Sequence, residues 1–540
     1  MARRSRWWGW GTDAHAGSLP EPALPLLRDE LGVDGAAHGP VALEDVALAE
    51  PALGEGLLDR LRAVAGVTTD RTTRIVHAAG KGYVDLVRLR SGRPQDAPDA
   101  VVRPGDAAGV LALLELCAAE RIAVVPFGGG TSVVGGLTPT REGFAGVISL
   151  DLGGLTGIAR LDDRSSTATV RAGTQGPELE ALLGAEGYTL GHFPQSFEYI
   201  SIGGAVATRS AGQASTGMGR IDKLVTGLRC ATPSGEMDLA PMPGTAAGPD
   251  LRELLIGSEG ALGVITDATL RIRRAPGADR YEGWMLPSFA AGAEAFRELV
   301  QAGAAPDVAR LSDADETRFS MIASGATDGT KGDVLRRYLG ARGIAGGCLM
   351  IVGWLDAAEA IGRRRQAAGA AIRRAGGAGL GASAGRSWEK NRYHGPYLRD
   401  HLLDRGVMTE TLETATTWDN LFRLYDAVGR ALRESLAARG TPPIVWCHIS
   451  HLYPSGCSLY FTFLAKQERG TEVEQWAAAK QAACRAILAA GGTLTHHHAV
   501  GLDHAPFLSE EVGPLGIAAL RAVKAELDPA GIMNPGKLLA

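Results

Sequence analysis

The chain has 540 residues, of which 45% are hydrophobic and 21% are charged, and its formal net charge is −5. This is the composition of a folded globular protein, with a length that allows about three or four domain-sized units. A mildly acidic chain without a block of basic residues is a poor nucleic-acid binder, because phosphate neutralisation needs clustered Lys and Arg. We therefore expect an enzyme that binds no nucleic acid.

The sequence contains no uncharged apolar run of about 18 residues, so we predict no transmembrane helix. The basic start at Arg3 and Arg4 is not followed by an apolar segment before Asp13, and we expect no signal peptide. The six cysteines are scattered without a CxxC pair, which is typical of reduced thiols. Together with the Ala-, Gly- and Arg-rich composition, this favours the cytoplasm of a bacterial cell.

The first half of the chain changes character near residue 100. Residues 1–95 combine Pro-rich turns with short amphipathic helices, and a strand is possible at 72–77. An alternation of strands and helices then begins, and Asp106 is placed to cap a helix. The expected elements are strands at 101–104, 122–126, 146–152, 155–161 and 166–172, helices at 106–120 and 178–187, and a long strand at 263–273 with one face half exposed.

Pro276 and Gly277 mark the first domain boundary in the second half. Pro442 and Pro443 mark a further junction. The expected elements are strands at 348–354, 444–451 and 457–463, a turn at 454–456, and helices at 356–375 and 472–490. The predicted domains are an N-terminal helical region (1–95), a cofactor-binding domain (96–275), a cap or substrate domain (276–485) and a C-terminal segment that returns to the cofactor site (486–540).

A cluster of glycines follows the buried strand expected at 122–126. Residues 128–130 are consecutive glycines, and Thr131 and Ser132 come directly after them. Without Cβ atoms, backbone N–H groups can converge on an anion, and the hydroxyls add donors. The spacing is neither that of a P-loop nor that of a Rossmann fingerprint. The segment predicts either a pyrophosphate site or an ordinary glycine-rich turn.

Two further glycine-centred segments favour the pyrophosphate site. Gly203 and Gly204 lie within residues 194–212, and a third segment spans 257–266. Glycine pairs allow close approach of a flat ring or a ribose. Three such loops in one predicted domain suggest an extended dinucleotide that lies between two small α/β lobes.

Tyr460 is a candidate catalytic residue. Alternation along the strand expected at 457–463 places it on the polar face, opposite Leu459 and Phe461. A phenol on that face can meet a ligand, or it can be an ordinary tyrosine at an internal interface.

Three consecutive histidines, His496, His497 and His498, form the next candidate site. If the segment is extended, His496 and His498 point to one side and His497 to the other. No cysteine or carboxylate cluster nearby completes a metal site, so we predict no metal. Imidazoles titrate near neutral pH and suit general acid–base or oxyanion work. A polar surface loop is the other interpretation.

Arg310 and Arg399 are candidates for binding a phosphate or carboxylate, because a guanidinium offers a bidentate fork. From the residues alone, each could equally be a surface arginine or one that pairs with a neighbouring helix.

The three glycine loops resemble the FAD-binding domain of the vanillyl-alcohol oxidase family, also called the para-cresol methylhydroxylase (PCMH) type. The resemblance implies an α+β fold with a two-lobed PCMH-type FAD-binding domain, an α/β cap domain, and helical N- and C-terminal segments. The His that links FAD covalently in this family is absent from residues 128–136, which implies non-covalent FAD. The implied FAD contacts are Pro126, Phe127, Gly128, Gly129, Gly130, Thr131, Ser132, Gln195, Ser196, Phe197, Glu198, Tyr199, Ile200, Ser201, Thr208, Arg209, Ser210, Ala211, Glu259, Gly260, Ala261, Leu262, Gly263, Val264 and Ile265.

Within this family, the match narrows to the alkyldihydroxyacetonephosphate synthase branch, in order along nearly the whole chain. The segments that resemble this branch are 4–10, 309–311, 397–400, 460–461, 496–501 and 528–538. The resemblance implies exchange of the acyl group of acyl-dihydroxyacetone phosphate for a fatty alcohol through a flavin N5 adduct, which yields an ether-lipid precursor without net redox change.

The same resemblance implies roles for the candidate residues. Tyr460 would accept and donate the proton, and Arg399 would hold the substrate. Arg310 and the three histidines would support turnover in the same pocket. A homodimer, a lipid-like substrate in an apolar tunnel of the cap, and peripheral membrane contact are further expectations.

Two other classes of protein remain open. A flavin-dependent oxidase or dehydrogenase of a 2-hydroxy acid shares the fold, the FAD loops and the ending at residues 534–536. Such enzymes usually keep a metal- or carboxylate-binding His/Glu set in place of three histidines, which counts against them. The third class is a flavin-binding protein without turnover.

Overall fold

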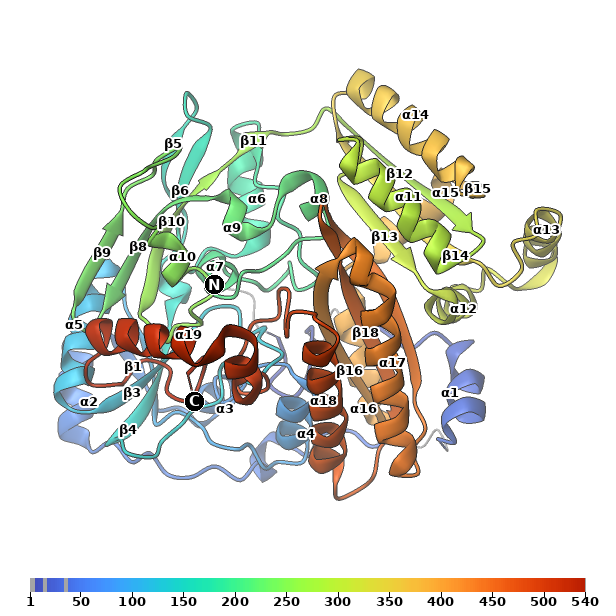
Figure 1. Cartoon of the computed structure of the whole chain (residues 1–540). Coiled ribbons are helices and arrows are strands. Elements are labelled where there is room, and N and C mark those ends of the chain that lie inside the picture. The colour runs from blue at the N-terminus through green and yellow to red at the C-terminus, as the bar shows by residue number, and fades with distance from the viewer. Residues whose placement is uncertain (1–4, 13–16, 34–36, 540) are drawn as a thin grey trace.

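The structure is a computed structural model that describes residues 5–12, 17–33 and 37–539. Two α/β lobes lie beside a cap that is built on a large antiparallel sheet (Figure 1). Arg4, at the start of the segment 4–10, lies outside the described residues. Within the described ranges, no helix is both long enough and apolar enough to cross a membrane.

The first lobe holds a four-stranded sheet in the order β1-β2-β4-β3. Strands β2, β4 and β3 are parallel, and β1 is antiparallel to β2. Parallel strands need a crossover, and α5 supplies the one between β2 and β3. The elements are α1 (Ala23–Leu31), η1 (Leu43–Asp45), α2 (Glu55–Arg62), β1 (Gly66–Thr68), α3 (Arg71–Val76), α4 (Tyr83–Arg90), β2 (Ala100–Arg103), α5 (Ala107–Ala119), β3 (Ile122–Phe127) and β4 (Gly146–Asp151).

The second lobe holds a five-stranded antiparallel sheet in the order β5-β6-β10-β8-β9. The small β7–β11 ribbon connects this lobe to the cap. The elements are η2 (Leu152–Gly154), β5 (Ile158–Asp162), β6 (Thr167–Arg171), α6 (Gly176–Ala185), β7 (Tyr188–Thr189), α7 (Ile202–Ala207), α8 (Ser215–Met218), α9 (Ile221–Leu224), β8 (Val225–Thr232), β9 (Gly235–Leu239), α10 (Arg252–Leu255), β10 (Val264–Arg271) and β11 (Arg273–Arg274).

The cap is a seven-stranded antiparallel sheet in the order β15-β12-β14-β13-β17-β18-β16. Its elements are β12 (Ala278–Leu286), α11 (Phe289–Gln301), β13 (Val308–Ser312), α12 (Ala314–Ala323), α13 (Gly329–Gly340), β14 (Cys348–Asp356), α14 (Ala358–Arg374), β15 (Ala378–Gly381), α15 (Ala382–Asn391), α16 (Gly395–Asp404), β16 (Val407–Thr417), η3 (Trp418–Asn420), α17 (Leu421–Ala438), β17 (Ile444–Tyr453), β18 (Gly456–Lys466) and α18 (Glu472–Ala489).

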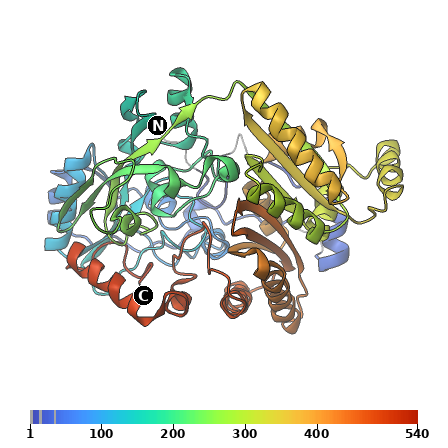
Figure 2. The same cartoon turned by 45° about the horizontal axis from the view of Figure 1, so that its top comes forward.

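Helices α11, α14, α17 and α18 cover one face of the cap sheet (Figures 1 and 2). Leu459, Phe461 and Phe463 of β18 belong to the hydrophobic core beneath these helices. Because side chains alternate along a strand, Tyr460 and Thr462 face the opposite way. The predicted alternation of this strand is confirmed, and it leaves a polar inner face on the cap sheet.

The chain after α19 (Ala505–Leu527) returns to the first lobe. The N–H of Asn534 donates to the carbonyl oxygen of Val124 in β3 at 2.8 Å. Its side-chain amide donates to the carbonyl oxygens of Gly136 and Glu259. The C-terminal tail therefore fastens two of the glycine loops to each other.

Two predictions about local structure are wrong. Residues 72–77 belong mainly to α3 and not to a strand, because the Asp70 carboxylate caps that helix by accepting from the N–H of Thr73 at 2.8 Å. Strand β10 is not half exposed along one face. Only Asp267 and Arg271 escape full burial in it, since both α5 and α7 contact this strand.

Candidate active site

A cavity of about 1700 Å³ is lined by both lobes and by the inner face of the cap sheet. Sites for single small ligands usually have about 300–1,000 Å³. The volume is therefore sufficient for a dinucleotide together with a second, extended molecule.

The first glycine loop leads from β3 into this cavity. A Cβ atom on Gly128 would lie 2.0 Å from Ser201 Oγ, and one on Gly129 would lie 2.0 Å from the carbonyl oxygen of Tyr199. Gly130 has a φ of +71°, which side chains with a Cβ rarely adopt. Glycine is required at 128 and 129 because the two lobes meet there, and at 130 because of its positive φ.

The backbone N–H groups of this loop are available to an anion. Those of Gly129, Gly130, Thr131 and Ser132 donate no hydrogen bond to any residue that the structure describes, and all four residues line the cavity. Converging N–H groups without internal partners form an anion-binding nest. These residues fit the pyrophosphate of FAD.

The other two loops contribute to the same cavity wall. Ser201 caps α7 by accepting from the N–H of Gly204, and Glu259 adopts a positive φ of +54° next to Gly260. The sequence-predicted FAD contacts that line the cavity are Pro126, Phe127, Gly128, Gly129, Gly130, Thr131, Ser132, Gln195, Ser196, Ile200, Ser201, Thr208, Ser210, Ala211, Glu259, Gly260, Gly263, Val264 and Ile265.

Six predicted FAD contacts lie outside the cavity lining. The ring of Phe197 stacks on Tyr393, and Glu198 accepts a hydrogen bond from Tyr397. The guanidinium of Arg209 pairs with Glu253 at 2.7 Å. The remaining three, Tyr199, Ala261 and Leu262, are buried side chains. These six residues pack against other parts of the protein and not against the cavity.

Tyr460 lines the cavity from β18. Its ring stacks on His448 of β17, with centroids 4.8 Å apart and an interplanar angle of 16°. The ring of His498 lies 5.5 Å away, edge to face. Burial raises the pKa of the Tyr460 phenol, so the group carries its proton at neutral pH.

Arg310 of β13 is held at the cavity wall by two residues that the sequence analysis missed. It donates from Nη2 to Glu316 Oε1 at 2.7 Å and from Nη1 to His448 Nε2 at 3.0 Å. His448 Nδ1 lies 3.1 Å from Glu316 Oε1. A neutral His448 with its proton on Nδ1 satisfies both neighbours, and burial lowers the pKa of His448 accordingly. No local sequence signal connects these three positions.

Arg399 reaches the cavity from α16. Its Nη2 lies 3.0 Å from Glu410 Oε1, and its Nη1 donates to the carbonyl oxygen of Lys81. Glu410 also accepts from the indole of Trp476 at 2.9 Å. The arginine is 8% exposed. These partners fix its guanidinium where it lines the cavity and can meet an anion.

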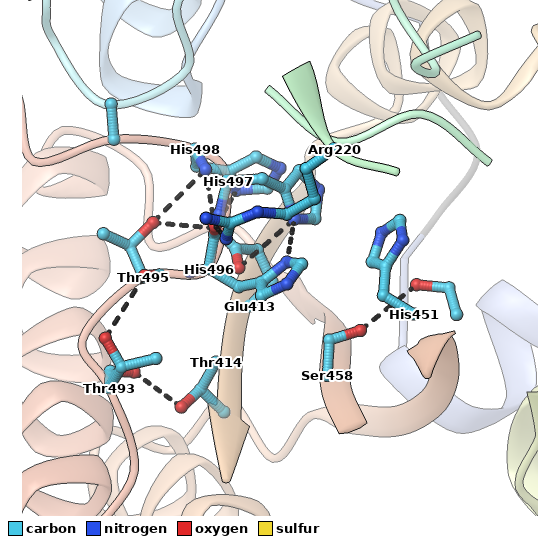
Figure 3. A network of polar contacts seen from close by, with 12 residues as sticks. Arg220, Glu413, Thr414, His451, Ser458, Thr493, Thr495, His496, His497 and His498 are labelled. Carbon is cyan, nitrogen blue, oxygen red and sulfur yellow. Dashed lines mark hydrogen bonds and ion pairs between the residues drawn. The ribbon is translucent and has the colours of Figure 1, made fainter. Parts of the chain in front are cut away.

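The three histidines lie on a bent segment, so the alternation expected for an extended segment does not apply to them. Their backbone N–H groups converge on the buried carboxylate of Glu413, which bends the chain (Figure 3). His497 and His498 line the cavity, whereas His496 is hydrogen-bonded to Tyr453 at 2.6 Å. The expectation of no carboxylate near the histidines is therefore wrong.

These side chains could hold a metal ion. Two groups have ligand atoms within 4.8 Å of one another, namely His451 with His496 and His497, and Glu413 with His497 and His498. Imidazole and carboxylate ligands suit zinc. Several of the ring nitrogens already have partners, however, such as Ser215 Oγ at 2.5 Å from His451 Nδ1. Burial lowers the pKa of His496 and of His498 to about 3, so both rings are neutral hydrogen-bonding groups.

Known families match both halves of the chain. Residues 98–238 match the FAD binding domain, and residues 275–538 match the C-terminal domain of FAD linked oxidases. Together with the anion nest and the cavity, these matches define an FAD-dependent enzyme with a PCMH-type fold.

The most informative relatives narrow this class. The alkyldihydroxyacetonephosphate synthase of Trypanosoma brucei brucei is 33% identical over 91% of this chain and 82% of its own length. That of Dictyostelium discoideum is 30% identical over 100% of this chain and 94% of its own. A solved alkyldihydroxyacetonephosphate synthase structure has a TM-score of 0.85 at 28% identity and covers 99% of both chains. The chain belongs to the alkyldihydroxyacetonephosphate synthase family.

Proposed function

We propose that the protein exchanges the acyl group of acyl-dihydroxyacetone phosphate for a fatty alcohol and so makes an ether-lipid precursor. The ester C–O bond to the fatty acid breaks, an ether C–O bond to the alcohol forms, and the alcohol loses its proton. No electrons are gained or lost overall. The arrangement of Tyr460, Arg399 and His498 on one wall of a cavity that continues past the FAD nest carries this proposal.

Arg399 is suited to hold the phosphate of the substrate. Its guanidinium is buried and oriented by Glu410 and by the carbonyl oxygen of Lys81. A bidentate arginine fixes a phosphate in orientation as well as in position. Arg399 and Tyr460 line the same cavity, and the charge of Arg399 acts on the Tyr460 phenol, so a substrate held at Arg399 would reach Tyr460.

Tyr460 is suited to move the proton at the reacting carbon. Burial keeps its phenol protonated, and the positive charge of Arg399 favours the phenolate when the proton leaves. The rings of His497 and His498 lie beside it, with centroids 6.1 Å and 5.5 Å from the ring of Tyr460. FAD, when bound, supplies the isoalloxazine ring as the nucleophile of the exchange.

Apolar side chains line part of the cavity, as hydrocarbon chains require. They come from α12, α13 and the cap strands, and they include Phe319, Met321, Leu335, Leu349, Leu380 and Trp446. Burial of each methylene in such a lining contributes about 0.8 kcal/mol. A lipid-like substrate is consistent with this lining.

The test is an anaerobic titration of the FAD-loaded enzyme, followed by its visible spectrum. Acyl-dihydroxyacetone phosphate is expected to bleach the flavin band without an electron acceptor, and a fatty alcohol is expected to restore it. If the spectrum stays oxidised with this substrate but is bleached by a 2-hydroxy acid, the enzyme is an oxidoreductase. That alternative has less support, because the relatives that are 33% and 30% identical to this chain are synthases.

The proposal includes a homodimer in the cytoplasm that contacts membranes peripherally. Val334 of α13 is 63% exposed and also lines the cavity, which supports entry of lipid substrates from a bilayer at this end. Co-sedimentation with phospholipid vesicles is expected for the wild type and weaker for Val334→Glu. Light scattering that gives a monomer mass would overturn the dimer.

A further inference from the structure

Glu413 is a buried carboxylate that accepts an unusual number of hydrogen bonds from one loop. It lies in β16, is 2% exposed, and sits beneath residues 495–498, which we call the histidine loop (Figure 3). Its carboxylate accepts from the N–H groups of His496 at 2.5 Å, His497 at 2.9 Å and His498 at 2.7 Å. The hydroxyl of Thr495 donates to it at 2.7 Å. Four donors from one loop therefore converge on one side chain.

The position of Glu413 in the sheet connects this loop to the reactive phenol. Glu413 is paired directly with Tyr460 in the register between β16 and β18, so both side chains leave the sheet on the same face. The sheet therefore holds the Glu413 carboxylate beside the Tyr460 phenol. The rings of His497 and His498 lie 6.1 Å and 5.5 Å from the ring of Tyr460.

An ionised carboxylate suits this position better than any other side chain. Burial alone would raise the pKa of Glu413, but His497 and the other neighbouring donors hold it well below its usual range. An ionised carboxylate accepts about four hydrogen bonds and donates none. The amide of glutamine would instead direct two N–H groups at the loop's own N–H groups.

We propose that Glu413 is a positioning residue that fixes the histidine loop, so that His497 and His498 stand against Tyr460 in the cavity. The catalytic part of this inference rests on the proposed function, whereas the anchoring of the loop does not. Misplacing a group by about 1 Å near the reacting atoms can cost on the order of 100-fold in rate.

The direct test is hydrogen–deuterium exchange of the FAD-loaded enzyme in the peptide that covers the histidine loop. Glu413→Gln is expected to speed exchange at His496, His497 and His498. The matched control is Glu511→Gln, because Glu511 is an exposed carboxylate that accepts from Thr493 and from the N–H of Leu494 just before the loop. Unchanged exchange at the three histidines in Glu413→Gln would overturn the anchoring.

Steady-state kinetics test the catalytic part. Glu413→Gln is expected to lower kcat for the acyl–alkyl exchange about 100-fold with KM changed less than about 3-fold, while FAD content is retained. Glu511→Gln is expected to keep kcat within about 3-fold of the wild type. A Glu413→Gln enzyme with loosened exchange but full activity would overturn the positioning role.

A double-mutant cycle separates positioning from a general loss of structure. If Glu413 acts through the loop, Glu413→Gln in a His498→Ala enzyme is expected to cost little more than His498→Ala alone. Independent, multiplying losses would contradict the proposal. If Glu413→Gln does not fold, Glu413→Asp keeps the charge and takes its place in both tests, with smaller losses expected. A wild-type enzyme that exchanges no acyl group would refute the proposed function, and hydrogen exchange would still decide the anchoring.

Discussion

The cavity has two walls of different construction. The backbone wall, formed by the glycine loops at 126–132, 195–211 and 259–265, presents N–H groups and small side chains. The side-chain wall, formed by Arg310, Arg399, Tyr460, His497 and His498, presents charged and aromatic groups. At the glycines of the backbone wall there is no room for a Cβ atom. In the side-chain wall, both arginines and the histidine loop depend on buried carboxylate partners.

This difference shows how the two walls achieve precision. Backbone N–H groups are positioned by the path of the chain, so the nest needs glycines at close contacts and little else. Long side chains must be immobilised individually. Glu316, Glu410 and Glu413 do so for Arg310, Arg399 and the histidine loop. The two walls are therefore expected to fail in different ways when residues are exchanged.

The largest effect is expected from Gly129→Val in the backbone wall. A Cβ at this position would lie 2.0 Å from the carbonyl oxygen of Tyr199, so the loop must move and the nest must open. The purified variant is expected to be colourless and inactive, as measured by the absorbance of released FAD. A yellow variant with a full complement of FAD would refute the nest.

Tyr460→Phe is expected to give the next largest effect. In contrast to Gly129→Val, it should lower activity while FAD stays bound. The ring can still stack on His448, but the proton carrier is lost, so kcat should fall on the order of 1,000-fold. The flavin spectrum and FAD content should equal those of the wild type. Activity within a few-fold of the wild type would remove Tyr460 from the chemistry.

A several-fold effect of pH is expected on FAD binding. Burial raises the pKa of Glu259 to about 7, and this side chain lines the cavity beside the nest. Below pH 7 the carboxyl is neutral, and above pH 7 its charge repels the pyrophosphate, so FAD affinity should decrease as the pH rises from 6 to 8. Fluorescence titration of the apoprotein measures this change. Glu259→Gln should bind FAD equally at both pH values, and a slope that persists in this variant would assign it to another group.

The smallest effect is expected from Arg209→Gln. Although this residue belongs to a loop of the backbone wall, its guanidinium pairs with Glu253 outside the cavity lining. FAD affinity should stay within about 2-fold of the wild type, as for other exposed ion pairs. A larger loss in the same titration would show that the backbone wall also uses a long side chain.

The sequence alone determined the features that depend on nearby residues. Asp106 caps α5 as predicted, the glycines at 128–130 form a loop directly after β3, and alternation places Tyr460 opposite Phe461 in β18. Caps, turns and strand faces follow from neighbouring residues in the chain, because they depend on local hydrogen bonds and on the two-residue repeat of a strand.

Only the tertiary structure decided how the side-chain wall is assembled. Glu413 is separated from the histidine loop by 85 positions at His498, and no local pattern marks it as the acceptor of that loop. The same holds for His448 beside Arg310, which come from neighbouring elements of one sheet. Strand order and the approach of α16 bring these groups together, and a buried carboxylate is recognised only by the donors that the fold places around it.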